Sequence, residues 1–141
     1  MAKVKVVDSE AIAWQRVAEA VAPEVAARMS PAEREGDVRI LHAAQGGLQL
    51  FEARIAPNEE ISLHAHIADE IIYILAGELQ IGRKRRRPGA SVFVAGETLY
   101  GFRSGPSGVR FLNFRGRGNT SFITREEYLA SHASGARSTS D

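Results

Sequence analysis

The sequence contains no cysteine, and this absence excludes disulfides, thiolate metal sites and a cysteine nucleophile. It also contains no apolar run that approaches the roughly 18 residues needed to span a membrane. The chain begins MAKVKVVDSE, which is charged, but no hydrophobic segment follows as it would in a secretory signal. We therefore expect a cytoplasmic protein that has no membrane partner.

The sequence also lacks an excess of charge of either sign. The chain has 18 Lys and Arg residues against 17 Asp and Glu residues, so its formal charge of +1 gives no general attraction to nucleic acid. The one concentrated basic run is Arg83 to Arg87, which stands between Gly82 and Pro88. No aromatic residue interleaves this run, and no second basic cluster accompanies it. We interpret it as an exposed hairpin arm that protects a sheet edge, with an anionic substrate or acidic partner as the alternative, and expect no nucleic-acid partner.

An amphipathic stripe occupies the first part of the chain, with apolar residues three or four positions apart: Trp14, Val17, Val21, Val25 and Met29. This spacing predicts helix that packs outside the main domain or in a dimer contact. Pro23 interrupts the stripe, so we expect two short helices that meet there. Ser30 and Glu33 have the spacing of a capping box, and Pro31 suits the first helical position. One more helical turn is therefore predicted, ending near Gly36.

Beyond this helical part, the sequence changes to short apolar runs separated by turn residues. We expect strands over residues 38–44, 48–56, 61–66, 70–76, 78–82, 84–87, 91–94, 99–103 and 109–115. The separators include Gly77 and the segment Gly105 to Gly108, whose composition is typical of turns. Many short strands at even spacing predict an all-β, antiparallel sandwich or barrel.

The strongest chemical signal lies between Ile61 and Gly77. His64 and His66 are two positions apart, so in a strand both imidazoles point to the same face. A turn over the next three residues can bring Glu70 alongside, at the head of the following strand. Two imidazoles and a carboxylate with open positions are a donor set that Fe²⁺, Zn²⁺, Mn²⁺ or Ni²⁺ accepts. We therefore predict a site for a divalent transition metal, against the alternative of two surface histidines near an acid.

Strand alternation also predicts which neighbours of Glu70 line this site. Ile72 and Ile74 share the face of Glu70, so we expect them to supply apolar surface to a pocket. Tyr73 is an odd number of residues away and should point outside. The alternation therefore favours a site that is polar at its metal ligands and apolar around them.

The series His64, His66, Glu70 and Gly77 resembles the first motif of the cupin superfamily, H-x-H-x3-E-x6-G, without a gap. The glycine that this family usually has six residues before the first histidine is Asn58 here, and asparagine also tolerates positive φ in a turn. The second cupin motif, G-x5-P-x-G-x2-H-x3-N, has a weaker counterpart. Its positions are filled in order by Gly89, Ala95, Glu97, Tyr100 and Ser104.

The resemblance covers about residues 38–115 and implies a cupin-type double-stranded β-helix barrel with a metal inside, often assembled as a homodimer. The chain would then consist of an N-terminal helical extension over 1–36, the barrel over 37–118, and a C-terminal helix with a flexible tail over 119–141. Thr124 and Glu127 form a second capping box, which predicts that the last helix covers about 125–132. The small, polar residues after it are expected to be disordered.

Tyr100 stands where metal-binding cupins usually have their fourth ligand, a histidine. Its phenol, with a solution pKa of about 10, can bind a metal as phenolate or remain unbound as an acid, a base or a hydrogen-bond donor. If it does not ligate, the three other ligands leave positions that suit substrate and O₂ side by side on Fe²⁺. The alternative is a barrel aromatic whose hydroxyl is satisfied by a neighbour. Phe102 shares the face of Tyr100 and is expected in the wall of the pocket.

Three functions are consistent with these residues, and a small molecule is the partner in each. The leading hypothesis is a metal-dependent enzyme, with oxygenase chemistry on an enol, diketone or phenol-like compound at the His64, His66 and Glu70 centre. The second is a redox-neutral lyase or isomerase in which Tyr100 is the base. The third is a non-catalytic cupin that binds a small molecule.

Overall fold

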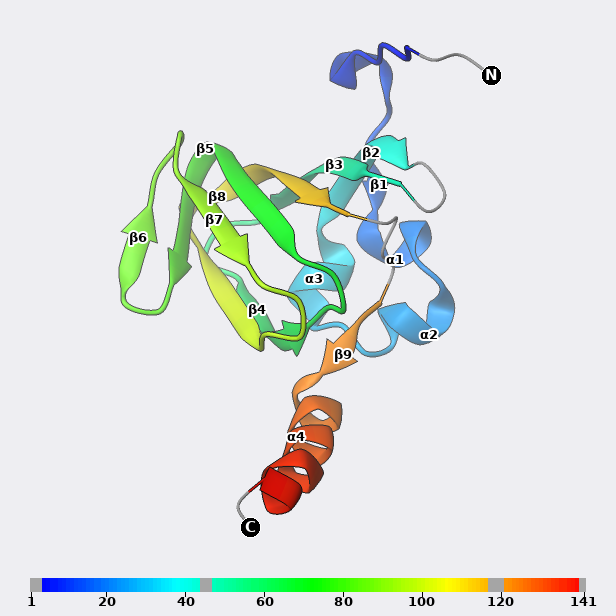
Figure 1. Cartoon of the computed structure of the whole chain (residues 1–141). Coiled ribbons are helices and arrows are strands. Elements are labelled where there is room, and N and C mark those ends of the chain that lie inside the picture. The colour runs from blue at the N-terminus through cyan, green and yellow to red at the C-terminus, as the bar shows by residue number, and fades with distance from the viewer. Residues whose placement is uncertain (1–3, 44–46, 117–120, 140–141) are drawn as a thin grey trace.

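The computed structural model describes residues 4–43, 47–116 and 121–139 of the chain. Figure 1 shows a barrel of strands with short helices along one side and a longer C-terminal helix that extends away from it. The helical elements are η1 (Ser9–Ala11), α1 (Val17–Ala20), α2 (Pro23–Ala26), α3 (Pro31–Glu35) and α4 (Arg125–Thr139). The strands are β1 (Gln15–Arg16), β2 (Asp37–Ala43), β3 (Gln49–Ile55), β4 (Glu60–Ala65), β5 (Glu70–Ile81), β6 (Lys84–Arg86), β7 (Ser91–Val94), β8 (Tyr100–Arg115) and β9 (Ile123–Thr124).

Strand β8 holds the sheet together because it is long enough to pair with three other strands. Its first part pairs with β4, its last part pairs with β3, and β5 pairs along most of its length. The sheet continues from β3 to β2 and β1, and from β5 to β6 and β7, with antiparallel pairing throughout these ladders. The all-β, antiparallel barrel that the strand pattern predicts is therefore confirmed.

Two of the predicted strand breaks are wrong. The structure joins the runs predicted as 70–76 and 78–82 into β5, and those predicted as 99–103 and 109–115 into β8. Gly77 and the segment 105–108 lie inside these two strands, where the β5–β8 register shifts on both sides of Gly77. Glycine and proline at such irregularities bend a strand without ending it. The short strand β9 was not predicted.

The turn backbone agrees with the cupin resemblance at two positions that lack glycine. Asn58 has φ of 55° and Glu97 has φ of 60°, and these are positions that the cupin motifs usually fill with glycine. The backbone N–H of Asn58 donates to the carbonyl of Gly105 at 3.0 Å, which fixes the turn against β8. The tolerance for positive φ predicted for Asn58 is confirmed.

The N-terminal segment folds as short helices, and the break predicted at Pro23 lies between α1 and α2. Trp14 differs from the prediction because it precedes β1 and lies outside any helix. Its ring contacts the guanidinium groups of both Arg39 and Arg54, whose central carbons are 4.3 and 4.2 Å from the ring centroid. The start of the apolar stripe therefore packs on the outer face of β2 and β3, in cation–π contacts.

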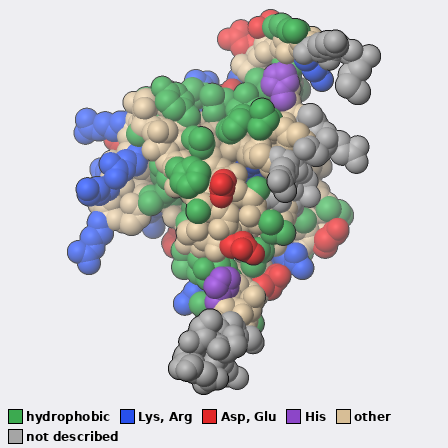
Figure 2. Space-filling model, in the orientation of Figure 1, with side chains coloured by type: hydrophobic (Ala, Val, Ile, Leu, Met, Phe, Trp, Pro, Cys, Tyr) green, Lys and Arg blue, Asp and Glu red, His purple; other side chains and the backbone are tan. Residues whose placement is uncertain are grey.

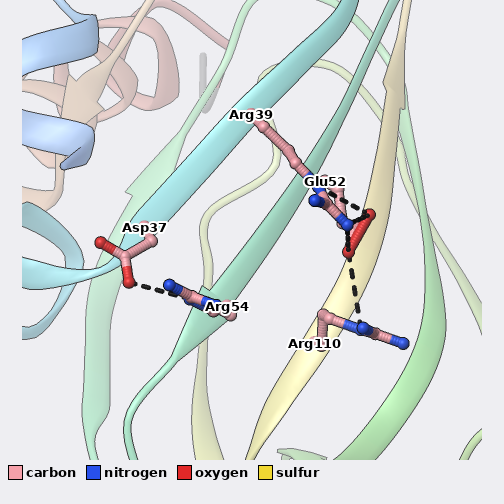
Figure 3. Close-up of polar contacts among 5 residues, drawn as sticks. All are labelled: Asp37, Arg39, Glu52, Arg54 and Arg110. Atoms are coloured by element: carbon pink, nitrogen blue, oxygen red, sulfur yellow. Dashed lines mark hydrogen bonds and ion pairs between the residues drawn. The ribbon is translucent and has the colours of Figure 1, made fainter. Parts of the chain in front are cut away.

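An ion-pair network on this outer face connects β2, β3 and β8 (Figure 3). The carboxylate of Glu52, with a side chain only 4% exposed, lies 3.1 Å from Arg39 and 3.5 Å from Arg110. Arg54 pairs with Asp37 at 2.9 Å beside it. A buried carboxylate is tolerated when its charge is paired and hydrogen-bonded, so we assign this network to the structure of the sheet.

The C-terminal helix begins as predicted and is longer than predicted. The N–H of Glu127 donates to the Thr124 hydroxyl oxygen at 3.1 Å, and the hydroxyl donates to the Glu127 carboxylate at 3.3 Å, so Thr124 caps the helix as the predicted box requires of its first residue. The backbone of α4 then continues to Thr139, so the predicted end at residue 132 is wrong. No proline interrupts this continuation. The last two residues and the predicted boundary at 118/119 lie outside the described residues. Within the described ranges, no helix is long and apolar enough to cross a bilayer.

The basic run forms the hairpin arm that the sequence predicts. β6 pairs with the end of β5, with Lys84 opposite Ile81 and Arg86 opposite Leu79, and its residues are exposed. Figure 2 shows the Lys and Arg side chains gathered at that edge of the molecule. Inside the barrel, by contrast, the side chains are apolar and buried. Ile72, Ile74 and Phe102 are at most 9% exposed and belong to the hydrophobic core.

Candidate functional site

The structure brings together the four polar residues that the sequence singles out. His64 lies on β4 opposite Tyr100, the first residue of β8, and Glu70 is the first residue of β5. His66 follows the end of β4. The side chains of both histidines and of Glu70 are buried, and the ring centroids of His64 and Tyr100 are 4.7 Å apart. The predicted apolar residues Ile72 and Ile74 continue inward from Glu70 as fully packed core.

Both imidazoles are oriented by backbone carbonyls. His64 Nδ1 donates to the carbonyl of Ser62 at 2.8 Å, and His66 Nδ1 donates to the carbonyl of Ser121. A carbonyl only accepts, so each Nδ1 carries the proton and each Nε2 presents a lone pair. Phe122, itself buried, stacks on His64 with ring centroids 4.9 Å apart and covers that imidazole.

Arg115, at the end of β8, occupies the centre of this site. Its Nε donates to Glu70 Oε2 at 2.7 Å, and its terminal NH2 group lies 3.2 Å from His66 Nε2, the lone pair of which accepts. The Tyr100 hydroxyl donates to the other oxygen of Glu70. The Glu70 carboxylate therefore has both oxygens engaged, and a partly buried cation, with a side chain 14% exposed, lies between it and His66.

The local charges set the ionisation of the site. Burial alone would raise the pKa of Glu70, but Arg115 and the Tyr100 hydrogen bond hold it below its usual value. Burial and the nearby Arg115 cation lower the pKa of His66 to about 3, so this imidazole is neutral at physiological pH. Burial and the Glu70 carboxylate raise the pKa of Tyr100 well above its usual value. Tyr100 is thus a persistent hydrogen-bond donor.

The arrangement does not fit a metal ion as it stands. The donor types suit a divalent metal, and imidazoles that donate Nδ1–H to carbonyls resemble metal-ligating histidines. Yet the Arg115 guanidinium is hydrogen-bonded to His66 Nε2 and to the Glu70 carboxylate, which are two of the three groups that would bind the metal. Its positive charge therefore stands where the metal would. Among the residues that the structure describes, no three His, Asp or Glu side chains converge so that they could hold a metal ion.

Sequence reasoning missed Arg115 and Glu33, which also faces the site. In α3 the Ser30 side chain makes no capping bond, so the predicted capping box is wrong, and the Glu33 carboxyl is buried instead. Burial raises its pKa, against the opposing effect of His64 and Arg115. A signal existed for Arg115, since it shares the strand phase of the core residue Phe111. The predicted capping box with Ser30 already accounted for Glu33, so no sequence signal pointed to it as a residue of the site.

A surface cavity of about 350 Å³ lies away from these residues. Its lining includes Arg16, Asp37, Arg54 and Arg110. Arg54 pairs with Asp37, and Arg110 pairs with Glu52. The charges of Arg54 and Arg110 are already neutralised by these pairs, so we do not regard the cavity as part of the candidate site.

Comparisons with known proteins agree with this fold. No family model and no curated protein matches the sequence. The polyketide cyclase RemF from Streptomyces resistomycificus is similar in structure, with a TM-score of 0.67 and 20% identity over 92% of this chain and 93% of that one. A putative acetylacetone dioxygenase from Methylibium petroleiphilum has a TM-score of 0.64 and 11% identity over 94% and 96%. An RmlC-like cupin from Shewanella frigidimarina has a TM-score of 0.52 and 20% identity over 66% and 80%.

At these identities, the likeness concerns the fold. The chain has the double-stranded β-helix fold of a small single-domain cupin, as the two motifs predict. Structures with this fold include enzymes of different kinds, so the reaction has to be argued from the residues of the site.

Proposed function

We propose that this protein is a cupin enzyme that moves a proton on a small, partly apolar compound with an enolisable carbonyl or a phenol-like group, without oxidising it. The observation that carries the proposal is the partly buried Arg115 cation, held between His66 and Glu70. A buried cation that is fixed before the reaction stabilises negative charge that develops on a substrate oxygen. The structural likeness to a polyketide cyclase is consistent with a redox-neutral reaction.

Each residue of the site has a separate role in this reaction. With the carbonyl oxygen near Arg115, loss of a proton from the adjacent carbon gives an enolate whose charge the remaining N–H groups of Arg115 stabilise, and the Tyr100 hydroxyl turns from Glu70 to the same oxygen. The proton acceptor is His64 Nε2, which is free because Nδ1 is committed to Ser62. The same imidazole returns the proton to a second carbon or to a leaving group. Glu70 positions Arg115 and Tyr100, and the raised pKa of Tyr100 argues against its use as the base.

The second candidate is the metal-dependent oxygenase that the sequence predicts, with His64, His66, Glu70 and Tyr100 as ligands. It is favoured by the two Nδ1–H donations to backbone carbonyls, which leave each Nε2 with its lone pair, although that of His66 accepts from Arg115. It requires Arg115 to leave the position it has in this structure. Elemental analysis of protein purified without chelator separates the candidates. We expect less than a tenth of a metal ion per chain, and near-stoichiometric iron together with oxygen uptake would establish the oxygenase instead.

Replacing Tyr100 by phenylalanine tests the proton-transfer reaction. With 1,3-diketones, β-keto esters and dihydroxybenzenes in D₂O, we expect enzyme-dependent deuterium incorporation beside the carbonyl, without oxygen uptake. Tyr100→Phe should lower kcat by about 100-fold, because it removes a donor to the developing charge. Tyr73→Phe is the matched control, since Tyr73 lies on the outer face and is 43% exposed. Equal activity of Tyr100→Phe and wild type would exclude the role given to the phenol.

We further propose that the protein forms a homodimer through the outer face of β5, β7 and β8. Ile71 lies opposite Phe93 on one side and Phe114 on the other, and all three are at least 38% exposed. Figure 2 shows hydrophobic side chains on this face. Such a continuous exposed patch is typical of an interaction surface.

A charge in this patch should separate the subunits. We expect Ile71→Glu to convert the protein to a monomer in light scattering coupled to size-exclusion chromatography, because it would bury an unpaired carboxylate. Leu129→Glu is the control, since Leu129 is similarly exposed but lies on α4. A monomeric wild-type protein, or an Ile71→Glu dimer, would contradict the assignment.

A further inference from the structure

Three buried side-chain oxygens around Arg115 have no hydrogen-bond partner among the described residues. They are Glu33 Oε1 on α3, Gln49 Oε1 on β3 and Asn113 Oδ1 on β8. A buried polar atom without a partner is costly, and native structures keep few of them. Their presence in one region therefore calls for a ligand that supplies the missing partners.

Their positions place all three at the candidate site. Gln49 is the cross-strand neighbour of Arg115, and Asn113 lies two residues before it on the same face of β8. Glu33 reaches the site from outside the barrel, because α3 lies beside β3 and β4, and its carboxyl interacts electrostatically with His64 and Arg115. The three side chains therefore come from positions next to the cation that the proposed reaction uses.

We infer that Glu33, Gln49 and Asn113 bind hydroxyl groups of the substrate, which is therefore a polyhydroxylated compound and not a simple diketone. A hydroxyl group donates to an amide or carboxylate oxygen, and it also accepts from a protonated carboxyl. It is thus the group that suits all three side chains, whereas a carbonyl could only accept. The inference rests on the proposed function for the location of the site and adds the substrate class. It also assigns part of the binding site to the N-terminal helices.

The test uses matched probes whose hydroxyls are present or masked. Binding of phloroglucinol, 1,3,5-trimethoxybenzene and acetylacetone to the full chain is measured by NMR titration. We expect phloroglucinol to bind at least tenfold more tightly than the other two compounds. Equal binding of the three, or no binding of phloroglucinol, would overturn the inference.

Variants then assign the effect to the three oxygens. Glu33→Leu and Asn113→Leu should each weaken phloroglucinol binding by about three- to tenfold, the effect of one lost hydrogen bond. Glu33→Gln should retain most of the affinity, because an amide both donates and accepts. Glu35→Gln is the control on the same helix, since Glu35 is exposed. Gln49→Leu replaces Asn113→Leu if the latter does not fold. Unchanged affinity in Glu33→Leu would contradict the inference.

The outcomes separate this inference from the proposed function. Deuterium incorporation in acetylacetone without preference for phloroglucinol would retain proton transfer and reject the hydroxyl-binding role. Tight, Glu33-dependent binding of phloroglucinol without any turnover would retain the binding role and reject the enzyme. A structure with phloroglucinol in which ordered water alone contacts the three oxygens would also reject the binding role.

Discussion

Glu70→Ala is expected to lower the free energy of unfolding by about 3 to 5 kcal/mol, because it leaves a buried arginine without its counter-charge. The side chains of Glu70 and Arg115 are only 1% and 14% exposed, so water cannot replace the lost partner easily. The Tyr100 hydroxyl would lose its acceptor in the same variant. Urea denaturation monitored by circular dichroism measures the change.

A double-mutant cycle identifies the cause of this loss. Removing both charges in Glu70→Ala with Arg115→Leu should recover a large part of the stability, since no unpaired ion remains. Arg54→Leu is the control for arginine removal, because Arg54 belongs to a half-exposed pair with Asp37. Additive effects of the Glu70 and Arg115 substitutions would show that the two groups are not coupled and would contradict the role given to this ion pair.

The same ion pair predicts a pH dependence. The pKa of Glu70 is lowered on folding from its ordinary value of 4.5, so its stabilising effect is present above pH 4.5 and is lost as the pH falls further. His66 acts in the same direction at higher pH, because its pKa falls from 6.5 to about 3 and the unfolded chain takes up the proton first. Comparison of wild type with Glu70→Gln between pH 3 and pH 7 isolates the carboxylate. We expect the variant to lose less stability below pH 4.5.

The sequence predicts most of the fold because strand signals are local. Alternation places Glu70, Ile72 and Ile74 inside and Tyr73 outside, and the structure agrees. The two false breaks have a different origin. Gly77 is a single glycine in an apolar run and residues 105–108 have the composition of a turn, and only the pairing of β5 with β8 shows that both strands continue. A turn and a bulge use the same residues, so composition alone does not separate them.

The site was predictable as far as its residues follow a motif. His64, His66, Glu70 and Tyr100 come from the two cupin motifs, and the structure places them together. Arg115 and Glu33 reach them only through the tertiary fold, one along β8 and the other from a helix outside the barrel. Arg115 changes the chemistry that the four motif residues support, because it supplies the positive charge expected from a metal. The motif residues therefore predict where the site lies more reliably than they predict whether a metal ion or a side-chain cation occupies it.

Gly77→Ala is expected to cost more than about 3 kcal/mol, the second of the two largest effects, because it adds a steric clash to a strained backbone. Gly77 has φ of +73°, and a Cβ atom there would lie 2.1 Å from the carbonyl oxygen of Gly108 on β8. The added Cβ is fixed to the backbone of β5, and the carbonyl oxygen belongs to the backbone of β8. Neither can move without disturbing the β5–β8 ladder. The loss is measured as a shift of the urea midpoint, or as loss of soluble protein if the variant does not fold.

Gly82→Ala separates the steric part of this effect from the conformational part. Gly82 has a similar φ of +62°, but a Cβ atom there would meet nothing within 4 Å. This control should cost only about 1 to 2 kcal/mol, the penalty for an alanine in the left-handed region. The difference between the two variants then measures how closely β5 and β8 approach at the glycine of the first motif. If both variants lose the same stability, the close approach does not explain the glycine, and positive φ alone accounts for it.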